Sequence, residues 1–141
     1  SFPHPAMVAF DAPSREECVA ERPRSNIPQQ ALVLLNDPVF VEAARALAER
    51  LLMEIEGNDD TRLALAFQLA LTREPSVKER QILTKLLAAQ RERYKANPED
   101  AKKLIATGSK QVAANLESHE LAAWTSIARA LLNIYETTAR F

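Results

Sequence analysis

Arginine and amide side chains gather near the start of the chain, and their types suit the binding of an anion or of an acidic protein surface. Five of them lie within a proline-rich stretch: Arg15, Arg22, Arg24, Asn26 and Gln30. Arginine held on a rigid loop forms paired bonds to carboxylate, sulfate or phosphate. Two interpretations stand: the cluster binds an anionic ligand or partner, or it pins the stretch to the rest of the fold through salt bridges and helix caps.

Residue types that commonly carry catalysis or bind metals are scarce. The chain has one cysteine, Cys18, and two histidines, His4 and His119. His119 and Glu120 match the first half of a zinc-protease motif, but Ala123 stands where the second histidine belongs. A lone cysteine cannot attach haem through a Cys-x-x-Cys-His motif, and it is more often a small buried residue than a nucleophile. We therefore predict no catalytic, metal-binding or cofactor-binding residue.

Haem carried by another module is an alternative to consider. His4, His119, Met7 and Met53 have side chains that serve as axial haem ligands. Isolated histidines and methionines are far more often ordinary surface or core residues, so these four do not change the prediction.

Charge and hydrophobicity exclude two classes of partner. Eighteen Lys and Arg against nineteen Asp and Glu give a net charge of -1, and the two signs are interspersed. Non-specific nucleic-acid binding needs a concentrated basic face, so we predict no nucleic-acid partner. No apolar run approaches the roughly 20 residues that span a bilayer, so no membrane span is predicted either.

Composition and length together predict one all-α domain over residues 1–141. Hydrophobic residues make up 47% of the chain, aromatic residues only 6%, and glycine occurs twice. A β-sandwich would need more β-branched and aromatic residues and more turn glycines. We therefore expect a compact bundle of about six helices.

Prolines divide this domain into an arm and a helical body. Five of the eight prolines fall in the first 28 residues, which predicts an arm over residues 1–37 with only short helices. Ser14 and Glu17 have the spacing of a capping box, and Asn26 can cap a second short helix that accepts Pro28 in its first turn.

The body over residues 38–141 has longer helices with apolar positions at steps of three and four. A start signal at Asn36-Asp37-Pro38 opens a helix that ends at Gly57, and Ser76 with Glu79 forms a capping box for another. The apolar stripes predicted to face the core are Phe40, Ala44, Leu47, Leu51 and Ile55; Leu63, Phe67, Ala70 and Leu71; Ile82, Leu83, Leu86, Leu87, Gln90 and Tyr94; and Leu121, Trp124, Ala128, Leu131 and Tyr135.

Three further signals set the ends of the body's later helices. Pro75 closes the helix that follows Asn58, and Asn97-Pro98 opens a short helix that Gly108 ends. Ser118 is predicted to cap the last helix, which should cross the centre of the domain. Between these two helices we expect a loop.

Several motifs closely resemble one family, and the longest of them is RPRSNIPQQALVLLNDP at residues 22–38. The others are FDAPSREEC at 10–18 and shorter matches at 40–45, 67–75, 123–124 and 130–133. The family is the planctomycete-specific C-terminal domain of unknown function found in large proteins associated with cytochrome c.

The resemblance implies a context more than an activity. It implies that the chain is a fragment of a larger exported or periplasmic protein, in which a c-type cytochrome module and another domain precede this one. The family brings no catalytic residues to carry over. We expect a non-catalytic accessory or interaction module whose partners are other domains of the parent chain, the cytochrome module among them. The alternative is part of a hydrolase or redox site that a neighbouring domain completes, acting on anionic glycans.

Overall fold

The computed structural model describes residues 36–134. These residues contain five α-helices, joined by loops, and no β-strand. The helices are α3 (Pro38–Glu54), α4 (Asp59–Leu71), α5 (Val77–Ala96), α6 (Pro98–Ile105) and α7 (Ser118–Leu132). The prediction of an all-α fold is confirmed. The predicted arm, apart from Asn36 and Asp37, and the end of the last helix at Tyr135 lie outside the described residues.

Polar side chains start the helices where the sequence predicts. Asp37 accepts a hydrogen bond from the backbone of Val39 at 2.8 Å, with Pro38 in the first turn of α3. The capping box of α5 is confirmed, since Ser76 and Glu79 each accept a bond from the other's backbone N–H.

Helix ends differ from the prediction by one to four residues: α3 ends at Glu54 rather than at Gly57, α6 ends at Ile105 rather than at Gly108, and one end each of α4 and α7 also differs. Helix α4 ends at Leu71 rather than near Pro75, because Thr72 turns the chain with a left-handed φ of 58°. The N-cap of α7 is Glu117 and Ser118 is already helical, so the predicted serine cap is wrong by one residue. Neither difference changes which face of α4 or α7 is buried.

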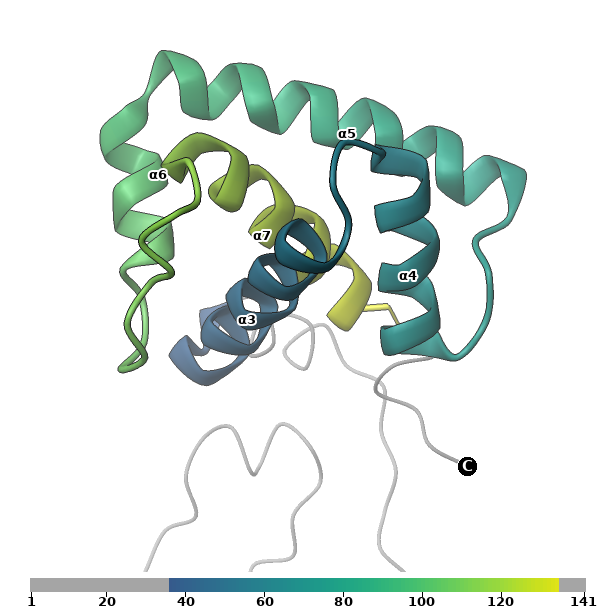
Figure 1. Cartoon of the computed structure of the whole chain (residues 1–141), viewed down its shortest axis with the longest axis horizontal. Coiled ribbons are helices and arrows are strands. Elements are labelled where there is room, and N and C mark those ends of the chain that lie inside the picture. Colours follow the sequence, from purple (N-terminus) through teal and green to yellow (C-terminus); the bar gives the residue numbers. More distant parts are fainter. Residues whose placement is uncertain (1–35, 135–141) are drawn as a thin grey trace, which may run out of the picture.

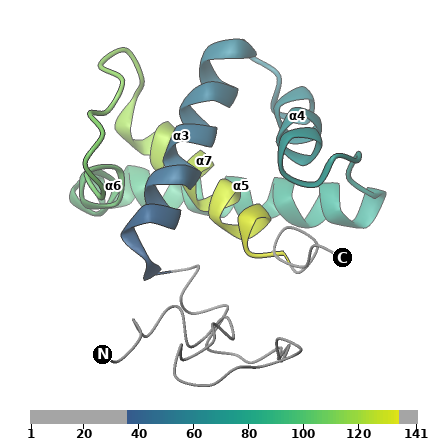
Figure 2. The same cartoon turned by 90° about the horizontal axis from the view of Figure 1, so that it is seen from below.

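Helix α7 forms the centre of the fold and packs against each of the other four helices. In Figure 1, α5 runs across the top of the molecule while α4 and α6 descend from its two ends. Figure 2 shows α3 crossing over α7 on the side away from α5. The prediction that the last helix crosses the domain is therefore confirmed.

The core consists mainly of aliphatic side chains around one fully buried tryptophan, Trp124. The other side chains with no exposed surface include Leu51, Leu63, Phe67, Leu121, Ile127 and Leu131. Truncating such a residue removes many close contacts at once, so this cluster sets most of the stability of the domain. No helix within the described part of the chain is long and apolar enough to cross a bilayer.

Two residues predicted to face the core are exposed instead. Phe40 is 37% exposed and Ile82 is 64% exposed, whereas the next residue in each case, Val41 and Leu83, is buried. Neighbouring residues on an α-helix point about 100° apart, so packing that buries one member of such a pair can leave the other exposed. The structure buries the second member of each pair.

Candidate functional site

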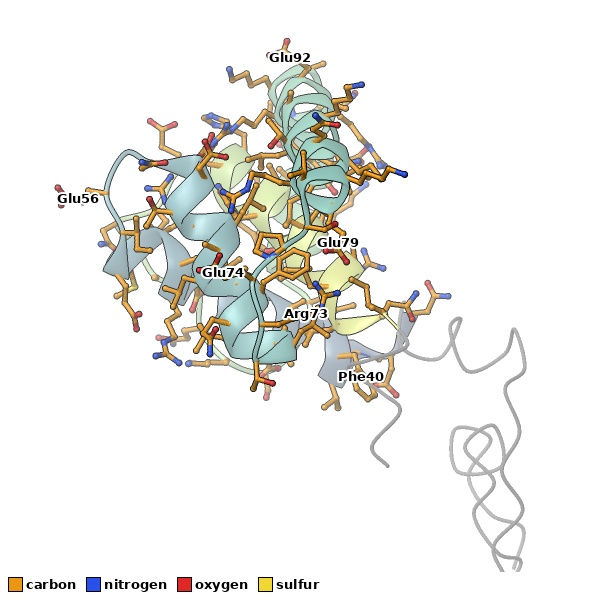
Figure 3. All side chains as sticks on the ribbon, turned by 90° about the vertical axis from the view of Figure 1, so that its right-hand side faces the viewer. Phe40, Glu56, Arg73, Glu74, Glu79 and Glu92 are labelled. Carbon is orange, nitrogen blue, oxygen red and sulfur yellow. The ribbon has the colours of Figure 1, made fainter. Side chains whose placement is uncertain are left out.

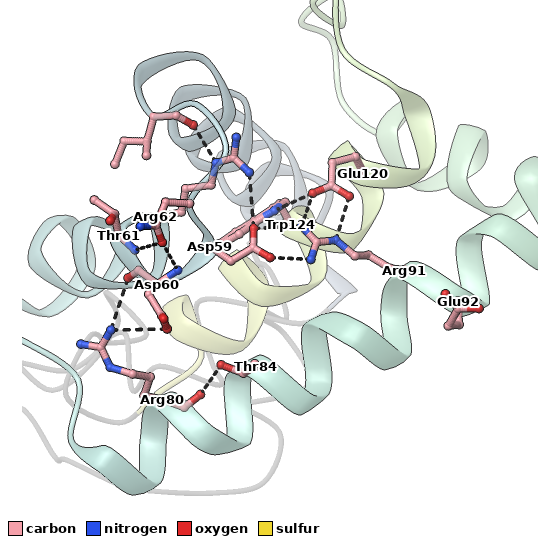
Figure 4. Close-up of polar contacts among 12 residues, drawn as sticks. Asp59, Asp60, Thr61, Arg62, Arg80, Thr84, Arg91, Glu92, Glu120 and Trp124 are labelled. Atoms are coloured by element: carbon pink, nitrogen blue, oxygen red, sulfur yellow. Dashed lines mark hydrogen bonds and ion pairs between the residues drawn. The ribbon is translucent and has the colours of Figure 1, made fainter.

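Charged side chains from three helices meet around Arg91, in the C-terminal half of α5 (Figure 4). Its guanidinium donates to both carboxylate oxygens of Asp59, at 2.6 and 2.9 Å. It also donates to both oxygens of Glu120, with the bond from Nε at 2.9 Å. One arginine thus joins the first turns of α4 and α7 to α5.

Local structure holds the two carboxylates in place. Asp59 is the first residue of α4, where Asn58 caps the helix by accepting from two backbone N–H groups. Glu120 lies in the first turn of α7, and the indole N–H of Trp124 donates to it at 3.1 Å from one turn further on. Arg62 closes the connection before α4 through the carbonyl of Ile55 at 2.8 Å.

The arginine keeps both carboxyl groups ionised. The hydrogen bond from Arg91 is the largest influence on Asp59 and outweighs burial, so the pKa of Asp59 is lowered. Burial alone would raise the pKa of Glu120, but the bond and charge of Arg91 and the bond from Trp124 together lower it. The two acids raise the pKa of Arg91 in turn.

These shifts decide what the Arg91 cluster can do chemically. A general acid needs a carboxyl that still holds its proton near the working pH, which requires a raised pKa. The pKa values of Asp59 and Glu120 are both lowered instead, and the carboxylate oxygens of both residues already accept hydrogen bonds from protein donors. The geometry therefore suits a structural clamp between helices.

The Arg91 cluster predicts how stability depends on pH. Because folding lowers the pKa of both carboxyls from ordinary values of 3.8 and 4.5, the stability they contribute is fully present above those values. This contribution to stability is lost as the pH falls through the lower pKa values that the two carboxyls have in the folded state. Below about pH 5, we expect the free energy of unfolding to fall less steeply with decreasing pH in Glu120→Gln than in the unmutated chain.

Urea unfolding at a series of pH values measures this difference. Glu92→Gln is the matched control, because Glu92 also lies on the polar surface but its side chain is 79% exposed. The free energy of unfolding of this control should depend on pH in the same way as that of the unmutated chain. If the free energy of unfolding varied with pH equally in the unmutated chain and in Glu120→Gln, this would contradict the role assigned to the Arg91 cluster.

A second polar cluster lies between α3 and the loop over residues 106–117. The guanidinium of Arg45, only 1% exposed, donates to the carbonyl of Ile105 and, at 2.6 Å, to that of Lys110. Glu49 lies 3.7 Å from the same guanidinium and accepts from the backbone of Ala113 at 3.4 Å. This buried ion pair holds the loop against α3.

Glu42 extends the same contact by one turn. Its carboxylate accepts from the backbone N–H of Ser109 at 2.6 Å, directly after Gly108. Gly108 has a φ of 101°, and a Cβ there would come within 2.1 Å of the Glu42 carboxylate. Glycine is thus required both for the backbone conformation and for the close approach.

A third arginine-centred contact closes the turn between α4 and α5. Arg73 and Glu79 lie side by side (Figure 3), with N and O atoms 2.7 Å apart. The bonds from Arg73 and from the backbone of Ser76 lower the pKa of Glu79 to about 2. The guanidinium of Arg73 also lies over the ring of Phe67, 5.3 Å from its centre.

The histidine and glutamate of the partial zinc motif take separate roles. The ring of His119 lies 3.3 Å from the carboxylate of Glu117, whereas Glu120 belongs to the Arg91 cluster. Within residues 36–134, no three His, Cys, Asp or Glu side chains form a group that could hold a metal ion. The predicted contact residues Arg15, Arg22, Arg24, Asn26 and Gln30 lie outside the described residues, as do Cys18, His4 and Met7.

The sequence did not indicate the contacts that Arg91 and Arg45 make. The acids that bind Arg91 are 29 and 32 residues away, and the carbonyls that bind Arg45 are 60 and 65 residues away, so no local spacing indicates these contacts. One signal was available: Arg45 and Glu49 fall beside the apolar positions of α3 at a helical step of four.

Comparison with known families gives one match. The model of the family described as PSD1, protein of unknown function (DUF1553), matches residues 1–87 of the 141. The chain belongs to the PSD1 family. No curated protein and no solved structure matches it.

The match ends inside α5 of this PSD1 chain, at Leu87. It therefore includes the arm, α3 and α4, while the central helix α7 lies beyond it. The Arg73–Glu79 pair lies within the matched part, and Arg45 joins the matched part to the segment that follows. Arg91 lies beyond the match and bonds both to Asp59 inside it and to Glu120 outside it. The resemblance to a domain of unknown function is confirmed at this level.

Proposed function

We propose that this chain is a non-catalytic interaction module of a larger exported protein of planctomycete type, and that its arm contacts the c-type cytochrome module of the same parent. The observation that carries the proposal is that the buried arginine and the half-buried arginine at the centre of the body's two main polar clusters are bound within the chain. Arg91 and Arg45 bind carboxylates and carbonyls of their own chain. We assign the contact with a partner to the arginines of the arm.

The chemistry of the arm supports an acidic partner surface. Arg22 and Arg24 flank Pro23, which restricts the backbone between them. Two guanidinium groups on a stiff segment can each form paired bonds with a carboxylate. The family resemblance supports the choice of a cytochrome module from the same parent chain as the carrier of those carboxylates.

Fluorescence at Cys18 tests the proposal directly. Cys18 is the only cysteine and lies in the arm, so one fluorophore can be attached there without any mutation. Haem absorbs visible light and quenches a nearby fluorophore. We expect saturable quenching when the cytochrome module of the parent is added at low salt, and weaker binding as salt is raised.

Charge variants separate a specific contact from general attraction. The double variant Arg22→Gln, Arg24→Gln should bind about tenfold or more weakly, because each lost charged bond contributes about 1.5–3 kcal/mol. Arg50→Gln is the matched control, since Arg50 is an exposed arginine of α3 that pairs with Glu54. Absence of quenching at low salt, or equal affinity of the double variant, would overturn the proposal.

A further inference from the structure

Helix α5 is strongly basic, although acidic and basic residues are equal in number over the described part of the chain as a whole. The helix contains six Lys or Arg and only two Glu, which gives it a net charge of +4. Half of its basic residues pair with carboxylates of the described fold: Arg80, Arg91 and Lys95. The other three, Lys78, Lys85 and Arg93, are exposed and form no ion pair with any residue between 36 and 134. The helix thus retains positive charge that its own fold does not neutralise.

Two of these lysines share one side of α5 with exposed apolar residues. This side, which we call the outer row, follows steps of four, three, four, three and four: Lys78, Ile82, Lys85, Ala89, Glu92 and Ala96. The row lies opposite the buried Leu87 and Tyr94, so all six of its residues are exposed. Val77, beside the start of the row, is 74% exposed. Spacing by fours and threes is that of a helix side along which a second helix packs.

We infer that the outer row docks an acidic amphipathic helix of a partner protein. Lys78 and Lys85 are seven residues apart, which is about 10 Å along the helix. Two carboxylates seven residues apart on the partner helix therefore meet both lysines. Ile82 lies between the lysines and contacts an apolar side chain of the partner, and Ala89 allows close approach further along.

The same features disfavour other occupants of the outer row. Two copies of α5 repel each other, since each carries a net charge of +4. A helix that lies in a bilayer surface has a side rich in Trp, Phe or Leu, whereas Ile82 is the only large apolar residue in the row. Glu92, whose side chain is 79% exposed, repels the phosphates of nucleic acid. The inference goes beyond the proposed function and does not depend on it, because it uses α5 and not the arm.

Isothermal titration calorimetry of the full chain with a synthetic peptide tests the inference. The peptide is an amphipathic helix with two Glu residues seven positions apart and a Leu between them, and a second peptide has Gln in place of both Glu residues. We expect saturable binding of the Glu peptide at low salt, and weaker binding as salt is raised. The Gln peptide should bind at least about threefold more weakly, because it lacks the charges that meet the lysines.

Charge reversal tests whether the outer row is the binding site. The double variant Lys78→Glu, Lys85→Glu should bind the Glu peptide at least about tenfold more weakly, because it places like charges in contact. Lys103→Glu, Lys110→Glu is the matched control, since it changes the net charge equally at two exposed lysines outside α5, and its affinity should stay within about twofold of the unmutated chain. Circular dichroism reports that each variant is folded.

Four results would overturn the inference. The first is no saturable binding of the Glu peptide at low salt, and the second is equal weakening in the α5 variant and its control. The third is equal weakening in Arg22→Gln, Arg24→Gln, because the peptide would then bind the arm. The fourth is tighter binding of phosphatidylserine vesicles or duplex DNA than of the Glu peptide, with loss of that binding in Lys78→Glu, Lys85→Glu.

Discussion

Replacing Trp124 with alanine is expected to lower the free energy of unfolding by about 3–5 kcal/mol. The side chain has no exposed surface and lies on α7, the helix that packs against all the others. The change would leave a large cavity at the centre of the fold and remove the indole donor to Glu120. A small domain is stable by only about 5–15 kcal/mol, so much of the chain would unfold under mild denaturation.

Urea unfolding followed by circular dichroism measures the loss at Trp124. Trp124→Phe is the matched control, since it keeps an aromatic ring and removes the N–H donor. Glu120 still accepts from Arg91 in that variant, so the expected cost is smaller, about 1–2 kcal/mol. A loss below about 1 kcal/mol for Trp124→Ala would be inconsistent with a core centred on α7.

Removing the buried guanidinium in Arg45→Ala is expected to cost about 3–5 kcal/mol as well. The change leaves the carbonyls of Ile105 and Lys110 without their donor and leaves the carboxylate of Glu49 buried beside no cation. Unpaired buried charge is among the most costly defects in a folded protein. The loop over residues 106–117 should therefore lose its attachment to α3.

Two measurements together test the role of Arg45. Urea unfolding gives the energetic cost, and faster amide exchange at Ala113 reports release of the loop, because that N–H is bonded to Glu49. Arg50→Ala is the matched control, since the side chain of Arg50 is 54% exposed and should contribute less than about 1 kcal/mol. Equal stability of the two variants would show that the loop is held by other contacts.

Local signals in the sequence predicted the helices well. The cap at Asp37 and the capping box of Ser76 and Glu79 depend on side chains within three residues of the groups they bind. The short helix after Asn97 begins with Pro98 as predicted, although the side chain of Asn97 forms no cap bond. The steps of three and four in α7 likewise identified its buried face, including Leu121, Trp124, Ala128 and Leu131. Such patterns are readable because the helix repeat itself sets them.

Contacts between distant segments were not predictable in the same way. The exposure of Phe40 and Ile82 depends on how α3 and α5 rotate against α7, which no single helix determines. The burial of Arg45 depends on a loop sixty residues further along the chain. The arm's binding residues, Arg22 and Arg24 among them, stay a prediction from the sequence and the resemblance.

Nuclear magnetic resonance of the full chain, titrated with the c-type cytochrome module that we propose as its partner, tests the central claim most directly. Trp124 is the only tryptophan, so its indole N–H gives one resolved signal within the Arg91 cluster. We predict that the signals of Arg22 and Arg24 shift on binding while those of the Trp124 indole and the Arg91 side chain do not. A saturable shift of the Trp124 indole without shifts in the arm would place the partner at the cluster and contradict the account.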